Sequence, residues 1–395
     1  MRTIFIFAGM AFCLGLAEFV MIGMTPALAT GLDTDIEQIG DIVGLYGLAC
    51  AVATPIIALT TSRMQRRRLF IVLALVFNVG NLLSVLAMGY MNLAVSRMMA
   101  ACTSGPLLAI MLTIVPNIVC EQRRAMGIAI VLGGFTLASV IGIPLAHVLA
   151  DMLGWKSVYV LVLVLGAGAT ILAERSLVEP KAPRNNAGIR AQLRLIVDPR
   201  VLLNALMILL GAAGVYVLYT YLTPYLEDTL GLEAQAASAA LLAIGIAGAA
   251  SNFLSGVVAN RFGRISLPII YLMIAVLLGG STVLVHHPMI AVIAVFFACL
   301  LMYVMNSIVQ LIFLDVAASD CPQAATLASS LHPTAFNAGI ALGSFVGGVV
   351  VGDLGLFATG AVGGALALVA AVCAVALLRV LGAKSASRAR GVYSP

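Results

Sequence analysis

Long apolar runs recur along nearly the whole length of the 395-residue chain and constrain its fold more than any other feature. Each run has about 20 or more residues, enough for a helix to cross the roughly 30 Å hydrocarbon core of a bilayer. Charged residues make up only 9% of the chain, against about 25% in soluble globular domains. The chain is therefore predicted to lie in a membrane.

Only helices and closed barrels satisfy their backbone polar groups in lipid. Barrel strands are about ten residues long and alternate between polar and apolar positions, whereas these runs are longer and rich in Leu, Ala, Val and Gly. We therefore predict an all-α polytopic membrane protein, whose first run is too long for a signal peptide. Its twelve expected spans are 3–28, 38–62, 69–88, 92–116, 125–150, 155–177, 200–226, 235–259, 267–285, 289–317, 324–351 and 355–380.

Basic residues divide sharply between the two sides of the predicted spans. Every Lys and Arg except Arg97 and Lys156 falls on the side that holds both termini. The opposite connections are acidic and carry Asp33, Asp35, Glu37, Glu227, Asp228, Glu233 and Asp353. By the positive-inside rule, we expect both termini in the cytoplasm and the spans in the inner (plasma) membrane. The net charge of +5 then reflects topology, and no nucleic-acid partner is expected.

The second half of the chain repeats the first. Thr25-Pro26 aligns with Thr223-Pro224, each at the end of the first span of its half, and Gly142 aligns with Gly343. A parallel repeat of this kind predicts a binding site at mid-membrane between the halves. We expect an N-terminal six-helix bundle at 1–177, a cytoplasmic linker at 178–199, a C-terminal six-helix bundle at 200–381 and a cytoplasmic tail at 382–395.

Several motifs resemble those of a known family. Residues 256–264 resemble the G-x-x-x-D/N-R-x-G-R loop between spans 8 and 9 of the major facilitator superfamily, with the motif positions at Gly256, Asn260, Arg261, Gly263 and Arg264. Four stretches resemble the sugar-efflux and arabinose-efflux-like branch of its twelve-span drug:proton antiporters: 15–19, 133–138 together with 142–144, 221–225 and 335–339. The resemblance covers the whole chain. It implies the major facilitator fold, with two pseudo-symmetric bundles, and a secondary transporter of sugars, nucleosides or neutral antibiotics such as phenicols.

Glu18 is the only acid placed deep in a predicted span. A carboxylate at mid-membrane is costly and is typically found facing a cavity, a partner or a proton path. It is therefore a candidate proton carrier, and the alternative is a structural Glu hydrogen-bonded to a neighbouring helix. Tyr216 occupies the equivalent position of the second half. The resemblance also implies proton coupling by a span-1 acid at this position.

Arg97 lies about one turn into span 4, and its series with Ala101 and Gly105 resembles the superfamily pattern of Arg followed by small residues. One interpretation is a guanidinium that biases the protonation of Glu18. The alternatives are an arginine that snorkels to the surface or one that pairs with a carbonyl of a neighbouring helix. The sequence does not choose between them.

Span 5 carries small residues and a proline, which the resemblance associates with antiport and with sealing of the halves. Small residues let helices approach closely and proline favours a bend, so simple packing explains them equally well. The positions are Gly133, Gly134, Gly142 and Pro144.

Uncharged polar side chains inside the spans suit a neutral, hydroxyl-rich or heterocyclic solute, although many such residues only join helices. The cavity candidates are Tyr46, Tyr216, Tyr219, Asn306, Gln310, His332 and Asn337. Span 4 departs from the relatives at 103–108, where it reads Thr-Ser-Gly-Pro-Leu-Leu, so the choice of substrate stays open.

The sequence contains no nucleophile elbow, Walker loop, metal box or paired catalytic carboxylates, so no enzyme, metal site or cofactor is expected. The leading prediction is proton-coupled antiport that exports a small neutral polar or amphiphilic solute by alternating access. Its energy source would be the proton gradient, and its partners the solute, protons and the lipid bilayer; a monomer is expected. The alternatives are a proton symporter or facilitator that takes up such a solute, and a non-transporting membrane sensor.

Overall fold

The computed structural model describes residues 2–61, 64–118, 120, 124–176, 195–320 and 325–391. Every regular element in these ranges is helical. Twelve stretches are long and apolar enough to cross a membrane. The predicted all-α fold with twelve spans is therefore confirmed.

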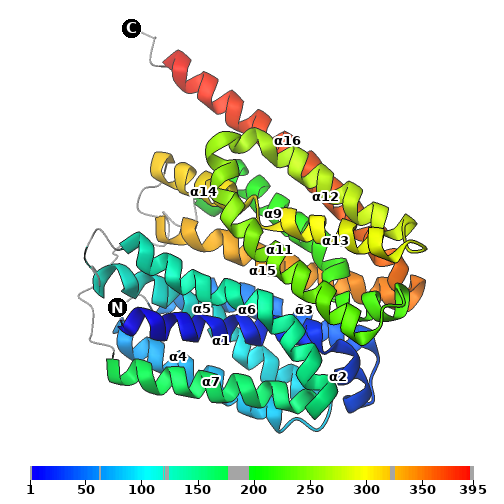
Figure 1. Ribbon diagram of the computed structural model, residues 1–395. Coiled ribbons are helices and arrows are strands. Elements are labelled where there is room, and N and C mark those ends of the chain that lie inside the picture. The colour runs from blue at the N-terminus through cyan, green and yellow to red at the C-terminus, as the bar shows by residue number, and fades with distance from the viewer. Residues whose placement is uncertain are drawn as a thin grey trace.

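The helices form two bundles, which Figure 1 shows as a blue-to-green group below and a green-to-red group above. The N-terminal bundle contains α1 (Arg2–Gly23), α2 (Thr25–Leu32), α3 (Ile36–Thr60), α4 (Arg66–Val85), α5 (Tyr90–Ile118), α6 (Arg124–Leu153) and α7 (Trp155–Ser176). The C-terminal bundle contains α9 (Pro199–Tyr219), α10 (Leu222–Pro224), the π-helical turn η2 (Tyr225–Thr229), α11 (Ala234–Arg261), η3 (Gly263–Ile265), α12 (Ser266–Val283), α13 (Pro288–Met302), α14 (Asn306–Asp320), α15 (Ala325–Leu354), η5 (Leu356–Ala358) and α16 (Thr359–Gly391).

The repeat is visible in the packing of equivalent helices. In the first bundle α1 packs along α6, where a methyl group on Gly134 would collide with the backbone carbonyl of Ala8. In the second bundle α9 packs along α15, where a methyl group on Gly343 would lie 2.5 Å from the carbonyl oxygen of Ala213. Each bundle thus uses glycine to bring its first helix against its fifth.

The helices break at the repeated Thr-Pro pairs. The first predicted span continues to residue 28, but α1 ends at Gly23 and α2 starts beyond Met24. The seventh predicted span continues to 226, but α9 ends at Tyr219 and the chain re-enters a helix at Leu222. Proline lacks the N–H of the helical ladder and disfavours a helix in the turn before it, where both breaks lie. Pro26 also lies in the first turn of α2, a position that suits proline.

We call the end of the molecule where α1 begins and α16 ends the terminus side, and the opposite end, which carries Asp33 and Asp353, the far side. The linker predicted at 178–199 lies mostly outside the described residues, so the domain division stays a prediction. α16 continues to Gly391, past the predicted start of a tail at 382.

Candidate functional site

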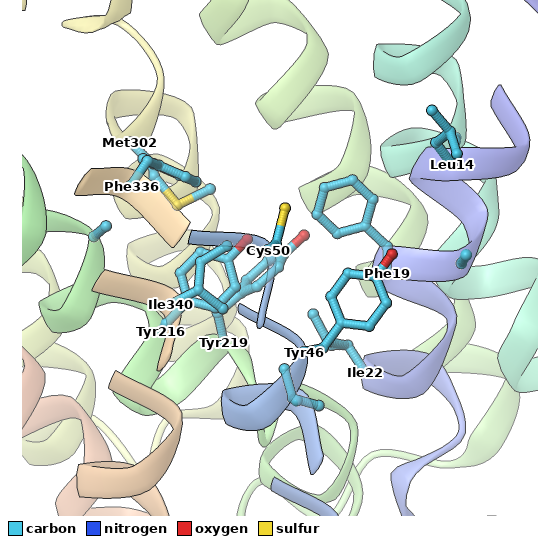
Figure 2. Close-up of a cluster of buried hydrophobic side chains, with 14 of the residues drawn as sticks. Leu14, Phe19, Ile22, Tyr46, Cys50, Tyr216, Tyr219, Met302, Phe336 and Ile340 are labelled. Carbon is cyan, nitrogen blue, oxygen red and sulfur yellow. The ribbon is translucent and has the colours of Figure 1, made fainter. Parts of the chain in front are cut away.

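A small cavity, with room for about one water molecule, lies between the two bundles. Helices α1 and α3 line it from the first bundle, and α9 and α15 from the second. Figure 2 shows Phe19 beside Tyr46, with Tyr216, Tyr219 and Ile340 gathered opposite them. The lining residues, which define what we call the central cavity, are Glu18, Phe19, Ile22, Val43, Tyr46, Gly47, Tyr216, Asn337 and Ile340.

Glu18 reaches the central cavity from α1. Among the described residues its carboxyl group has no hydrogen-bond or ion-pair partner. In this conformation Glu18 therefore does not make, among the described residues, the hydrogen bond to a neighbouring helix that a purely structural role would require. An unpaired carboxyl group that faces a cavity is free to exchange a proton with water or with a bound solute.

Arg97 is completely buried, which is incompatible with snorkelling to the surface. Its guanidinium donates to the carbonyl oxygen of Ala17 at 2.6 Å and to Oδ1 of Asn81 at 3.0 Å. It also lies over the rings of Tyr46 and Tyr159, 5.1 Å from each centroid. Arg97 therefore joins α5 to the turn of α1 that carries Glu18, through the backbone rather than through an ion pair with the carboxylate.

Three predicted candidates present unused polar atoms at the central cavity. The hydroxyl groups of Tyr46 and Tyr216 and Oδ1 of Asn337 are buried without a hydrogen-bond partner in the described structure. Buried polar groups are usually paired. These three atoms are therefore available to a solute that can donate and accept hydrogen bonds.

The other candidates are not among the residues that line the central cavity. Tyr219 packs edge-on against Tyr216, with ring centroids 5.3 Å apart. Asn306 donates to Oδ1 of Asn252 at 3.2 Å and Gln310 donates to the carbonyl oxygen of Ser329 at 3.5 Å, so both amides contact neighbouring helices. The ring of His332 lies 6.2 Å from that of Phe336, and its Nε2 has no partner among the described residues.

Sequence reasoning missed the apolar part of the lining: Phe19, Ile22, Val43, Gly47 and Ile340. Apolar residues inside apolar spans carry no signal that separates a cavity wall from a lipid-facing surface. Only the motif resemblance at 15–19 drew attention to Phe19.

The span-5 residues have different environments. A methyl group on Gly142 would lie 2.9 Å from a methyl of Leu16, so this position packs against α1, as Gly134 does. A methyl group on Gly133 would meet nothing within 4 Å. Pro144 lies inside α6, which continues through it.

The span 8–9 motif forms the connection between α11 and α12 on the terminus side. Gly263 has a positive φ of 58°, which favours glycine. Arg264 pairs with Asp315 of α14, and the guanidinium of Arg261 lies 5.6 Å from the ring centroid of Phe262. Asn260 is exposed, and Gly256 has no neighbour within 4 Å of an added methyl group. These residues lie away from the central cavity.

Contacts between the bundles enclose the central cavity and continue beyond it on the far side. Near the middle of the helices, a methyl group on Gly47 of α3 would lie 2.9 Å from the carbonyl oxygen of Asn337 on α15, and one on Gly245 of α11 would lie 2.8 Å from that of Val140 on α6. On the far side, a methyl group on Gly40 of α3 would collide with the hydroxyl of Tyr221 from the second bundle. The hydroxyl of Thr223 donates to the carbonyl oxygen of Ile22 at 2.7 Å. A solute in the central cavity therefore has no open route to the far side in this conformation.

Comparisons with known proteins agree with this architecture. The family model of the Major Facilitator Superfamily matches residues 7–332. The chain is 31% identical to the MFS-type transporter YtbD of Bacillus subtilis, over 92% of this chain and 91% of that protein. It is 29% identical to the inner membrane transport protein YdhP of Escherichia coli K12, over 86% of each chain.

A protein named as a probable sugar efflux transporter of Helicobacter acinonychis is 26% identical, over 94% of this chain and 93% of that protein. The crystal structure of a D-xylose–proton symporter superposes with a TM-score of 0.72 at 13% identity, covering 94% of this chain and 96% of that one. At this identity the superposition shows a shared fold. Together with the twelve spans and the family match, these findings show that the chain belongs to the Major Facilitator Superfamily.

Proposed function

We propose that the protein is a proton-coupled antiporter that exports a small neutral polar or amphiphilic solute by alternating access. The observation that carries the proposal is Glu18, an unpaired carboxyl group in a cavity lined by both bundles. Proton and solute would use the same space in turn, so protonation of Glu18 favours one orientation of the bundles and solute binding favours the other.

The proposal places both termini in the cytoplasm, because nearly all basic residues lie on the terminus side. In this orientation the far side faces the cell exterior, and the conformation described above is closed to the outside. Solute would enter the central cavity from the cytoplasm in this state. Protons would enter from outside in the opposite state, in which the far side is open.

The proposed solute class follows from the lining of the central cavity. Phe19, Tyr46 and Tyr216 offer aromatic faces, and the two tyrosine hydroxyls with Asn337 offer a few hydrogen-bonding groups. A neutral sugar, nucleoside or phenicol-type antibiotic is compatible with this lining. The relative named as a probable sugar efflux transporter supports export of such a solute. The energy source is the proton gradient, and no cofactor is part of the proposal.

Transport by purified protein in proteoliposomes tests the role of Glu18. One radiolabelled solute of each of the three classes is offered, and both pH-gradient-driven transport and solute counterflow are measured. We expect Glu18→Gln to abolish gradient-driven transport while counterflow persists, because exchange of solute needs no proton. Asp353→Asn, an exposed acid on the far side, should leave both activities unchanged. Undiminished gradient-driven transport by Glu18→Gln would exclude Glu18 as the proton carrier.

The same assay distinguishes the alternative of a symporter or facilitator. Solute accumulation inside the vesicles driven by an acidic exterior would indicate symport. Transport that runs down the solute gradient at the same rate with and without a pH gradient would indicate a facilitator.

A further inference from the structure

The central cavity is too small to hold a solute by itself. It has room for about one water molecule, whereas pockets for small molecules typically measure about 300–1,000 Å³. A solute therefore needs a surface that continues from the cavity. Asn337 lines the cavity from α15, and Pro333 and Ser329 lie on the same face of that helix, one and two turns toward the terminus side. Both are exposed, so the first bundle does not cover this face of α15.

Helix α14 runs antiparallel beside this face of α15. Nε2 of Gln310 on α14 donates to the carbonyl oxygen of Ser329 at 3.5 Å, which fixes the register of the two helices. Asn306, one turn earlier on α14, therefore lies level with Pro333 of α15. Asn337, Asn306 and Gln310 form what we call the amide strip, which runs from the central cavity toward the terminus side.

The partners of the two asparagines determine which end of each amide is free. Nδ2 of Asn337 donates to the carbonyl oxygen of Pro333 at 3.0 Å, and this oxygen can only accept, so Oδ1 is the free end. Nδ2 of Asn252 donates to the carbonyl oxygen of Gly248 at 3.4 Å, so the Oδ1 of Asn252 faces α14. That oxygen accepts from Nδ2 of Asn306 at 3.2 Å. The Oδ1 atoms of Asn306 and Asn337 are both buried without a partner among the described residues.

A buried carbonyl oxygen that lacks a partner is costly, and it can accept a hydrogen bond but cannot donate one. We propose that the amide strip binds the transported solute and selects one with several hydroxyl donors, such as a sugar or another polyol. A solute whose polar groups only accept would leave both Oδ1 atoms unpaired. The inference rests on the proposed function, because it specifies the chemistry of the exported solute.

Asn78 on α4 has the same local geometry without facing the central cavity. Its Nδ2 donates to the carbonyl oxygen of Ala74 at 2.7 Å, with the same four-residue spacing as Asn337 and Pro333, and its Oδ1 is also unpaired in the described structure. Its Nδ2 also donates to Thr170 of α7 at 3.0 Å, so the side chain lies inside the first bundle. Asn78 is therefore a matched control for an asparagine that only packs helices.

Equilibrium binding to the purified full chain in detergent tests the proposal without a proton gradient. The probes are D-glucose, D-xylose and uridine, with analogues of each in which fluorine replaces one hydroxyl group. Fluorine adds no bulk and cannot donate a hydrogen bond. We expect the hydroxyl-rich probes to bind, and at least one fluorinated analogue of each binder to bind about tenfold more weakly. Equal affinity for every analogue, or binding of none of the hydroxyl-rich probes, would overturn the proposal.

Variants assign the lost hydrogen bonds to the strip. We expect Asn337→Leu and Asn306→Leu each to weaken binding of the parent probe about tenfold. In each variant, one sensitive analogue should show no further loss, because the shared hydrogen bond is already absent. Asn78→Leu should bind every probe as the wild type does. Fully additive losses for all analogues in both strip variants would overturn the assignment. Thermal unfolding verifies that the variants are folded, and the analogue series on the wild type needs no variant.

This inference and the proposed function can fail separately. If fluorinated analogues bind as well as their parents while Glu18→Gln loses gradient-driven transport, the amide strip is wrong and the coupling role of Glu18 stands. If the analogues bind weakly while Glu18→Gln keeps gradient-driven transport, the coupling role is wrong and the amide strip stands.

Discussion

At the scale of single residues, Arg97 shows how a buried charge can act without an ion pair. Its two hydrogen bonds go to Ala17 and Asn81, and its guanidinium lies over the rings of Tyr46 and Tyr159. This arrangement holds the backbone beside Glu18 while the carboxyl group stays unpaired. The guanidinium thus positions Glu18 indirectly, through its hydrogen bond to the backbone of Ala17, the preceding residue.

Replacing Arg97 with Lys keeps the charge but removes the planar fork and its stacking. We expect Arg97→Lys to destabilise the purified protein by on the order of 2 kcal/mol, because charged hydrogen bonds and desolvated cation–π contacts are lost. Thermal unfolding in detergent measures the effect. Arg261→Lys, in the exposed α11–α12 connection, should change the midpoint little. Equal midpoints for the two variants would show that the buried contacts of Arg97 contribute no stability.

The central cavity could be predicted only in part. Glu18 could be predicted from the sequence because a single acid among apolar residues is conspicuous. Tyr46, Tyr216 and Asn337 could be predicted because few side chains within a span are polar. Asn306 and Gln310 carry the same sequence signal but contact other helices. Which face of a helix meets the cavity depends on packing between distant segments, which a single sequence does not encode in any local pattern.

At the scale of helices, the repeated Thr-Pro pairs have diverged in function. The hydroxyl of Thr25, at the start of α2, donates to the carbonyl oxygen of Met21 near the end of α1 in its own bundle, at 2.9 Å. The hydroxyl of its mate Thr223 donates across the bundle boundary to Ile22. The duplication therefore supplied one local motif twice, and the second copy has become part of the far-side closure.

The spans themselves were predictable and their interruptions were not. Hydropathy identifies twelve apolar stretches because each must exclude water over the thickness of the bilayer. Hydropathy does not reveal changes of backbone direction within these stretches. One example is the apolar run Pro288–Asp320, which a turn at 303–305 divides into α13 and α14. Nothing in the composition of that run signals the turn.

Two adjacent glycines of α6 provide a matched test of helix packing. A methyl group on Gly134 would collide with the backbone of α1, while one on Gly133 would meet open space. We expect Gly134→Ala to destabilise the protein by about 1–3 kcal/mol through overpacking. Gly133→Ala should be neutral or slightly stabilising, because alanine favours a helix. Thermal unfolding in detergent compares them, and a larger loss for Gly133→Ala would contradict the observed α1–α6 interface.

At the scale of the whole molecule, a symmetric scaffold carries asymmetric chemistry. Both bundles pack their first helix against their fifth through glycines, yet the acid in the central cavity comes from the first bundle alone, opposite Tyr216 of the second. The far-side closure uses both bundles, through Thr223, Tyr221 and the His147–Glu227 pair. The acid of the cavity is thus contributed by one bundle, whereas the far-side contacts need both.

The orientation of this scaffold determines the direction in which a proton gradient would drive it. If the terminus side is cytoplasmic, the far-side contacts close the molecule to the outside, and under the proposed mechanism external protons drive export. If the orientation is reversed, the same contacts close it to the cytoplasm. The excess of arginine and lysine on the terminus side favours the first arrangement, because basic residues are retained in the cytoplasm during insertion.

Labelling of single cysteines in intact cells decides between the two orientations. Met88→Cys lies on the far side, and Ile265→Cys, 74% exposed in η3, lies on the terminus side. With a membrane-impermeant maleimide, we expect Met88→Cys to react in intact cells and Ile265→Cys only after permeabilisation. The reverse pattern would place the termini outside. The far-side closure would then face the cytoplasm, and the same proton gradient would act on Glu18 from the opposite direction.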